Sequence, residues 1–161
     1  MLVFDATPLI YLAKAEKLEE VDEMEGKKLV PEKVYREVVE EAEGEPDAER
    51  IEKAVEDDIF EIVSAEVEED TDFLSDADLQ VLKVAEQRDA VAVMDEENGR
   101  NVADIRGIET RGTAFIVLRM QKRKVISEEE AKETVDSMID EGWYCSTDLY
   151  KEIINKIGEL S

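Results

Sequence analysis

The sequence contains no histidine and only one cysteine among its 161 residues. Without histidine, the chain cannot form a serine–histidine–aspartate triad or any zinc site with a histidine ligand. Cys145 cannot form an internal disulfide, which fits a reducing compartment. Any metal ion must therefore be held by oxygen ligands, and this favours Mg²⁺ or Mn²⁺.

Long hydrophobic runs are also missing. No signal peptide and no stretch of 18 apolar residues is present, so we expect a soluble, cytoplasmic protein with no membrane partner. The chain has the length of a single domain, and 43% of its residues are hydrophobic, which is enough for a sizeable core.

Positive charge is scarce, because 44 acidic residues stand against 20 basic ones and give a formal net charge of −24. At low salt such a field repels nucleic acids and membranes. It is also typical of soluble proteins from halophiles, since molar salt screens charges beyond about 3 Å. We favour the halophilic interpretation as a hypothesis, and under it the net charge says little against a nucleic-acid partner.

Apolar runs alternate with amphipathic segments along the chain. This alternation predicts an α/β fold with a parallel sheet covered on both faces. Ser75 and Asp78 form a capping-box pattern, Ser127 is a good helix cap, and the charged run 66–72 is expected to be a solvated loop. Strands are predicted at residues 1–5, 27–30, 59–65 and 90–95, a short strand or loop at 108–112, and helices at 7–15, 31–44, 46–58, 74–89, 96–107, 113–124, 127–142 and 146–158.

Acidic residues are so common that the informative ones are those in acid-poor surroundings. Asp5 is the only acid in the first fifteen residues and follows a predicted strand, and Asp95 follows the strand-like run Val91–Met94 in the same way. In an open parallel sheet, ligands bind at the carboxyl ends of the strands. Both acids are therefore site candidates, and the alternative for each is a cap of the next helix. Glu96 either assists Asp95 or favours the dipole of the next helix.

Three further acids are ambiguous from the residues alone. Asp76 and Asp78 open a helix, where capping explains Asp78 as well as a site does. Glu37 lies at the border of an apolar helix face, so its side chain points either partly inward or into solvent. Two carboxylates about 4 Å apart repel by about 4 kcal/mol at an effective dielectric of 20, so a cluster of them needs a divalent ion or protonation. Such an ion activates water in phosphodiester hydrolysis.

Four segments resemble, in order, the successive motifs of PIN domains over essentially the whole chain. They are "VFDATPLIYLAK", "VPEKVYREVVEE", "LSDADLQVLKVAEQ" and "VAVMDEENGRNVADIRGI" with the following "RGT". The resemblance implies a three-layer α/β/α fold and a metal-dependent nuclease, usually a ribonuclease. Residues 74–113 are most similar to an archaeal branch shared by ribosome-maturation endonucleases and a VapC-like group, and the tail is similar to that VapC-like group. The absence of a cysteine cluster argues against a zinc-ribbon-bearing maturation nuclease and its ribosomal substrate.

The resemblance also implies the residues of the site. Thr7 matches the family's hydroxyl beside the first acid, with helix capping as its alternative. Arg100 and Thr113 match substrate-contacting positions, and the alternative for Arg100 is an ion pair with Glu96. Asp76 and Glu96 are secondary candidates. The catalytic residues, which are also the implied ligands of Mg²⁺ or Mn²⁺, are Asp5, Glu37, Asp78 and Asp95.

We expect a single PIN-like domain over residues 1–161, with an α/β core at 1–125 and additional C-terminal helices at 126–161. The expected activity is endoribonuclease cleavage of RNA, as the toxin of a pair with a partner antitoxin protein, and the expected assembly is a homodimer. Residues 100–124 carry seven basic residues against two acidic ones, which we interpret as a phosphate-facing patch, although a cationic helix end explains the last three. Trp143 and Tyr144 either stack on bases or, as we favour, pack in the core.

Other classes of protein gather acids in a similar way. A receiver domain needs a pair of acids at its first strand and a lysine after its last, whereas this chain offers Asp5 alone and Arg111. A haloacid-type phosphatase needs the pattern Asp-x-Asp-x-Thr, which Ala6 and Thr7 break. A non-catalytic nucleic-acid or protein-binding module with a PIN-like fold stays open, although the four acids argue against it.

Overall fold

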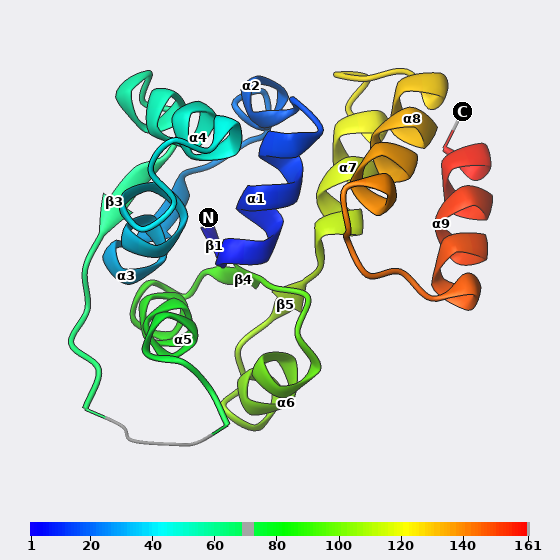
Figure 1. The fold of residues 1–161 in the computed structure, drawn as a ribbon. Coiled ribbons are helices and arrows are strands. Elements are labelled where there is room, and N and C mark those ends of the chain that lie inside the picture. Colours follow the sequence, from blue (N-terminus) through cyan, green and yellow to red (C-terminus); the bar gives the residue numbers. More distant parts are fainter. Residues whose placement is uncertain (69–72, 161) are drawn as a thin grey trace.

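Within the residues that the structure describes, five parallel strands form one sheet, in the order β3-β2-β1-β4-β5. The computed structural model describes residues 1–68 and 73–160 (Figure 1). The predicted strands are all present; β2 has the predicted length but is shifted by one residue, and the others are shorter than predicted. The strands are β1 (Leu2–Phe4), β2 (Lys28–Pro31), β3 (Glu61–Val63), β4 (Val91–Val93) and β5 (Thr110–Arg111).

Helices cover both faces of the sheet, which confirms the predicted three-layer α/β/α architecture (Figure 1). On one face lie α5 (Asp76–Arg88) and α6 (Glu97–Ile105). On the other face lie α1 (Ala6–Lys14), α4 (Pro46–Glu56), α7 (Thr113–Lys122) and the unpredicted short helix α2 (Leu18–Val21). Right-handed crossovers explain this division, because connections that run toward β3 and those that return toward β5 pass over opposite faces.

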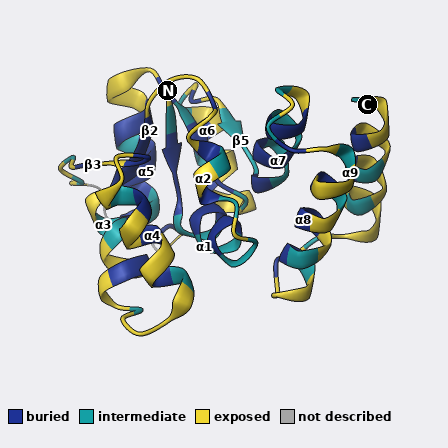
Figure 2. Ribbon diagram, turned by 90° about the horizontal axis from the view of Figure 1, so that it is seen from above, coloured by how far each residue is buried: buried dark blue, intermediate teal, exposed yellow. Residues whose placement is uncertain are grey.

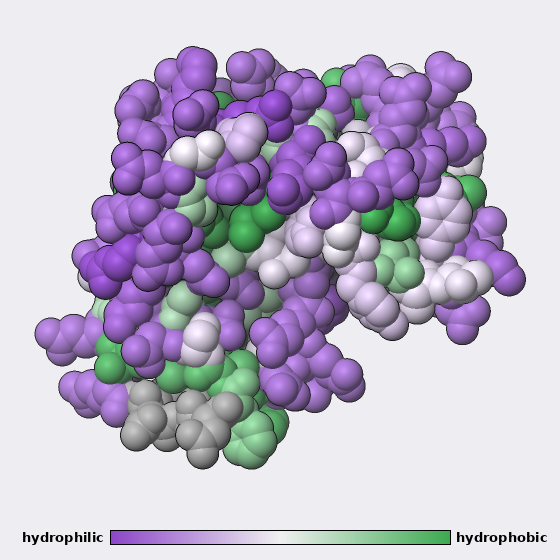
Figure 3. Space-filling view, in the orientation of Figure 1, coloured by the Kyte–Doolittle hydropathy of each residue, from purple (hydrophilic) through white to green (hydrophobic). Residues whose placement is uncertain are grey.

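The central strands are buried on both sides, as a covered parallel sheet requires. Val3, Phe4, Ala92 and Val93 have no exposed surface. Phe4 packs edge-on against Phe60, with ring centroids 5.3 Å apart. Buried residues line the middle of the molecule in Figure 2, and exposed ones follow the outer sides of the helices. Hydrophilic residues cover most of the face drawn in Figure 3, which agrees with the high content of acids.

The helix predicted at residues 31–44 is not one continuous α-helix. It consists of α3 (Glu32–Tyr35) followed by the π-helical turn η1 (Arg36–Glu40). The N–H of Glu41 donates to the carbonyl of Arg36, five residues earlier, at 2.8 Å. The apolar spacing of the sequence predicted a helical segment correctly, but it does not specify which carbonyl each N–H reaches. Single π turns often occur at functional sites.

The last two helices, α8 (Glu128–Asp140) and α9 (Thr147–Glu159), pack against α7, and α8 also contacts α1 (Figure 1). Ile116, Val117 and Met120 of α7 are fully buried, so its apolar sides are covered within the chain. The predicted caps are present at Ser75 and Ser127. In the ranges 1–68 and 73–160, no helix has both the length and the apolar character needed to cross a membrane. Of the predicted loop 66–72, residues 69–72 lie outside the described residues.

Candidate active site at the carboxyl edge of the sheet

The chain leaves β1 and β4 in opposite directions along the sheet. After β1 it continues to β2, whereas after β4 it continues to β5 on the other side. Such a switch point is where open α/β sheets bind ligands, outside the carboxyl ends of the strands. Asp5 directly follows β1 and Asp95 follows shortly after β4, and the register pairs Phe4 with Val93. The two acids therefore lie at the same edge of the sheet.

Asp5 both caps a helix and faces other carboxylates. Its Oδ1 accepts a hydrogen bond from the N–H of Ala6 at 2.8 Å, so it is the N-cap of α1. Its side chain is nevertheless buried, with 5% of the residue exposed. Burial first, and then the negative charge of Asp78, raise the pKa of Asp5 to about 8, and a hydrogen bond with Asp78 and the charge of Glu37 act in the same direction. In the absence of a cation, Asp5 holds a proton at neutral pH.

Asp78 likewise serves a cap and the candidate site together. It lies in the first turn of α5, where its Oδ2 accepts the N–H of Ser75 at 3.3 Å and its own N–H donates to Ser75 Oγ at 3.1 Å. Glu37 lies on η1, and partial burial of its carboxyl group raises its pKa, with Asp78 and Glu41 adding to the effect. Asp5, Asp78 and Glu37 thus come from three elements and form one electrostatically linked group.

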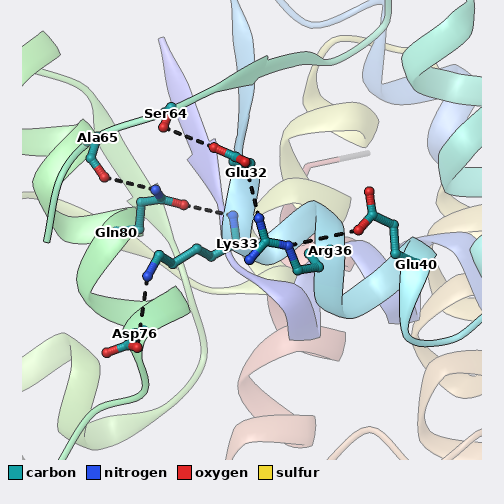
Figure 4. A network of polar contacts seen from close by, with 8 residues as sticks. All are labelled: Glu32, Lys33, Arg36, Glu40, Ser64, Ala65, Asp76 and Gln80. Atoms are coloured by element: carbon teal, nitrogen blue, oxygen red, sulfur yellow. Dashed lines mark hydrogen bonds and ion pairs between the residues drawn. The ribbon is translucent and has the colours of Figure 1, made fainter.

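A buried glutamine holds two of these elements together. Gln80 is 1% exposed; its Oε1 accepts the N–H of Lys33 at 2.8 Å, and its Nε2 donates to the carbonyl of Ala65 at 2.9 Å (Figure 4). The first bond connects α5, which carries Asp78, to the start of the helical segment that carries Glu37. The sequence analysis missed Gln80, although its position inside the apolar run Leu79–Leu82 was a signal.

Asp76 belongs to this network and not to the group around Asp5. Its carboxylate lies 3.8 Å from the ammonium of Lys33, and 75% of its side chain is exposed (Figure 4). Nearby, Arg36 pairs with Glu32 at 3.2 Å and with Glu40 at 3.8 Å. Both pairs of Arg36 lie within the segment formed by α3 and η1, so among these three ion pairs only Lys33–Asp76 connects α3 to α5.

Asp95 has a separate set of partners. Its Oδ1 accepts the N–H of Thr113 at 2.7 Å, and its Oδ2 accepts the Thr113 hydroxyl at 2.6 Å and the indole N–H of Trp143 at 3.1 Å. Thr113 is fully buried, so it supports Asp95 and does not itself face solvent. Gly112, the N-cap residue of α7, makes this approach possible, because a Cβ there would lie 2.9 Å from Asp95 Oδ1.

The remaining predicted site residues lie around these two groups. Thr7 is half-buried in the first turn of α1, and Glu96 is the exposed N-cap residue of α6. Arg100 is exposed on α6, with its Nη1 3.4 Å from the place that a Gly112 Cβ would occupy. In the part of the chain that the structure describes, Arg100 makes no ion pair, so the pairing with Glu96 is not formed.

Two arginines of the basic segment 100–124 lie at opposite ends of α7. Arg111 pairs with Glu109 at 3.0 Å and lies over the ring of Phe115 at 5.3 Å, next to the start of α7. Arg123 follows the other end of α7, where it pairs with Glu25 at 2.8 Å. A helix of this length separates its ends by about 15 Å. Of these two arginines, only Arg111 is close to the carboxyl edge of the sheet.

Carboxylate side chains are suitable ligands for a divalent cation, although the acids of the candidate site are not arranged closely enough to coordinate one. Among residues 1–68 and 73–160, no three acidic or cysteine side chains are close enough to hold a metal ion as they stand. The donors around Asp5 are nevertheless all carboxylate oxygens, which Mg²⁺ and Mn²⁺ prefer. In the metal-free protein, a proton on Asp5 reduces its repulsion with Asp78 and Glu37, and a bound cation would reduce the same repulsion.

A family model described as "PIN domain" matches residues 1–159. No curated protein matches the chain. The matched range contains all the acids discussed above and both C-terminal helices.

Proposed function

This chain belongs to the PIN domain family, and on that premise we propose that it is a metal-dependent endoribonuclease. PIN domains are generally nucleases, so hydrolysis of a nucleic acid is the class of activity, and a receiver domain or a haloacid-type phosphatase is no longer a competing interpretation. The observation that carries the proposal is Asp5, which is buried at the switch point of the sheet and faces Asp78 and Glu37.

In this proposal, each acid has a defined role. When bound, Mg²⁺ or Mn²⁺ supplies positive charge at the phosphodiester and lowers the pKa of a bound water. A carboxylate beside the bound water would accept its proton, and we assign this role to Glu37, which is partly buried beside Asp78. The residues that would hold the ion are Asp5, Glu37, Asp78 and Asp95.

The other predicted residues hold substrate or support the acids. Arg100, which has no ion-pair partner among the described residues, contacts a phosphate of the RNA. Thr7 offers its hydroxyl beside Asp5. Thr113 acts through Asp95, to which both of its donors are committed.

A substitution at Asp5 tests the site. In constant high salt, Mn²⁺ should raise the melting temperature of the wild type by mass action, and Asp5→Asn should lose most of that rise. Cleavage of single-stranded RNA should require the metal and disappear in the same variant. Asp76→Asn is the matched control, because it removes the same charge from an exposed carboxylate that faces Lys33.

Two results would change the proposal. If Asp5→Asn binds Mn²⁺ as the wild type does, the four acids do not form the metal site. If metal binds normally and no RNA is cut at any salt concentration, a non-catalytic nucleic-acid or protein-binding module with a PIN-like fold is favoured over the nuclease.

The wider setting of this activity is also part of the proposal. We take residues 1–161 as one domain of a cytoplasmic toxin from a halophilic archaeon, with an antitoxin as partner. A flanking reading frame that encodes a small DNA-binding protein would support the pairing. The chain is further proposed to form a homodimer, which light scattering at high salt tests. Because α1, α8 and α9 cover α7, the dimer surface lies elsewhere than on the apolar sides of α7.

A further inference from the structure

Trp143 reaches the candidate site from outside the α/β core. It lies in the connection between α8 and α9, is 5% exposed, and donates its indole N–H to Asp95 Oδ2 at 3.1 Å. A buried indole N–H needs an acceptor, and an ionised carboxylate has no other hydrogen-bonding role than to accept. The contact joins residues that are 48 positions apart.

The turn after α8 sets the position of this indole. Gly142 has a φ of +110°, a conformation that side chains rarely adopt, and a Cβ there would lie 3.5 Å from the hydroxyl of Tyr11 on α1. The backbone N–H of Trp143 then donates to the carbonyl of Met138 at 2.9 Å, which closes the end of α8. Met138 and Ile157 are fully buried where α8 and α9 pack on α7. The indole therefore has a fixed place relative to the sheet.

Two donors from different parts of the chain share one oxygen of Asp95. The Thr113 hydroxyl comes from the start of α7 and the indole from the α8–α9 connection, whereas Asp95 Oδ1 accepts the Thr113 N–H. Three donors at both oxygens fix the rotation of the carboxylate about its Cβ–Cγ bond. The orientation of Asp95 is thus set jointly by α7 and the C-terminal helices.

We propose that Trp143 is a positioning residue for Asp95 and that, through it, α8 and α9 are a working part of the candidate site. The expected effect of Trp143 on catalysis rests on the proposed nuclease function, whereas its contact with Asp95 is independent of that function. Trp143→Phe keeps an aromatic ring in the same pocket and removes the N–H. Met138→Leu is the packing control, since exchange of these two side chains is well tolerated.

A first experiment measures the contact without metal or RNA. In EDTA and constant KCl, melting temperatures are compared for the wild type, Trp143→Phe, Asp95→Asn and the double variant. Because the two residues touch, their effects should not add, and the double variant should melt within about 1–2 °C of the less stable single variant. Additive changes would overturn the proposal.

A second measurement covers the case in which Trp143→Phe does not fold. Trp143 is the only tryptophan in the chain, so the emission spectrum reports on the surroundings of this one indole. Asp95→Asn should shift the emission maximum, and Asp76→Asn should leave it unchanged. An unshifted spectrum in Asp95→Asn would count against the proposal.

The kinetic consequence is measured on RNA with Mn²⁺. Trp143→Phe should lower kcat by about 10-fold or more with KM nearly unchanged, as is typical when a group that orients a metal-site carboxylate is lost. Adding Trp143→Phe to Asp95→Asn should lower kcat no further, and Met138→Leu should stay within about twofold of the wild type. An unchanged kcat in Trp143→Phe would overturn the catalytic role. If the wild type cuts no RNA, the proposed nuclease fails, and the measurements in EDTA alone decide the role of Trp143.

Discussion

Thr113 donates both its backbone N–H and its hydroxyl to the carboxylate of Asp95, at 2.7 and 2.6 Å. The first N–H groups of a helix have no partner within it, and a negative charge there interacts favourably with the helix dipole. Gly112 has no side chain with which to cap α7, so Asp95 supplies the acceptor from the end of the neighbouring strand. The same carboxylate that is predicted to act in the site therefore also fixes α7 to the sheet.

Thr113→Val should lower the free energy of unfolding by about 1.5–3 kcal/mol, because a hydrogen bond to a charged acceptor is lost while the shape is kept. Thr134→Val is a matched control, since Thr134 is also buried and donates at 2.6 Å, but to the neutral carbonyl of Glu130. The control should cost about 0.5–1.5 kcal/mol. Urea denaturation in constant KCl measures both. Equal decreases in the free energy of unfolding would mean that the hydrogen bond to Asp95 stabilises the protein no more than the bond to a neutral carbonyl.

Gly112→Ala should destabilise the protein by about 1–3 kcal/mol, in the range of overpacked interior sites. Its Cβ would lie 2.9 Å from Asp95 Oδ1, and three hydrogen bonds prevent that carboxylate from moving aside. Gly158→Ala provides the control, because this glycine lies inside α9 with no atom within 4 Å of its Cβ position. There alanine should stabilise by about 0.5–1 kcal/mol. Melting temperatures should shift in opposite directions.

Gln80→Met should lower the free energy of unfolding by about 1–3 kcal/mol, because it leaves the Lys33 N–H and the Ala65 carbonyl without their partner. It should also weaken the stabilisation by Mn²⁺, since the elements that carry Glu37 and Asp78 lose a connection. Gln121→Met is the control. Gln121 is buried, bonds only the carbonyl of Ile157, and has an Oε1 with no partner among the described residues. Its replacement should cost less and leave the response to Mn²⁺ unchanged.

The pattern of residues predicted the strands of the sheet, with β5 left open between a short strand and a loop, and it predicted the capping box at Ser75 and Asp78. It also placed Asp5 and Asp95 correctly at strand ends. From the sequence alone, capping and a site are alternatives for Asp5 and Asp78, but in the structure each carboxylate caps a helix and also lies in the acidic group around Asp5. Local patterns therefore identified the residues without deciding between the roles.

Local sequence patterns did not predict the contacts between segments that are distant in the sequence. Nothing near Trp143 in the sequence indicates that its N–H reaches Asp95, and nothing near Gln80 points to Lys33. The π turn that carries Glu37 was missed for a related reason, since apolar spacing reports which side of a helix is buried and not its hydrogen-bond register. The pattern also did not indicate how the four acids are distributed in space. Asp5, Glu37 and Asp78 form one group, whereas Asp95 makes hydrogen bonds with other residues.

Added KCl should raise the melting temperature. With 44 acidic and 20 basic residues, the folded chain repels itself, and salt screens that repulsion. Melts between 0.1 and 3 M KCl in EDTA test this, with an uncharged osmolyte of equal osmolality as the control for solvent exclusion. A melting temperature that stays constant or falls with KCl would contradict the halophilic interpretation.

Asp5 should make the metal-free protein less stable as the pH rises. Burial and the charge of Asp78 raise its pKa from 3.8 to about 8 in the folded protein. Between these two values the folded state binds more protons than the unfolded state, so the free energy of unfolding falls with pH. The stabilisation is complete below pH 3.8 and is lost as the pH passes through about 8. Glu37, whose pKa is also raised, acts in the same direction.

Asp5→Asn isolates this contribution, because asparagine has nearly the shape of the protonated aspartic acid and does not titrate. In EDTA and constant KCl, the variant and the wild type should melt at similar temperatures near or below pH 3.8, and the variant should melt several degrees higher near pH 8. The exposed control Asp76→Asn should follow the wild type at both pH values. In saturating Mn²⁺ the order at pH 8 should reverse, because the cation binds the ionised carboxylate and the asparagine gives up a ligand charge. If the variant is the less stable protein in EDTA at pH 8, then Asp5 is not a repelled carboxyl group, and the reason for placing a cation beside it is lost.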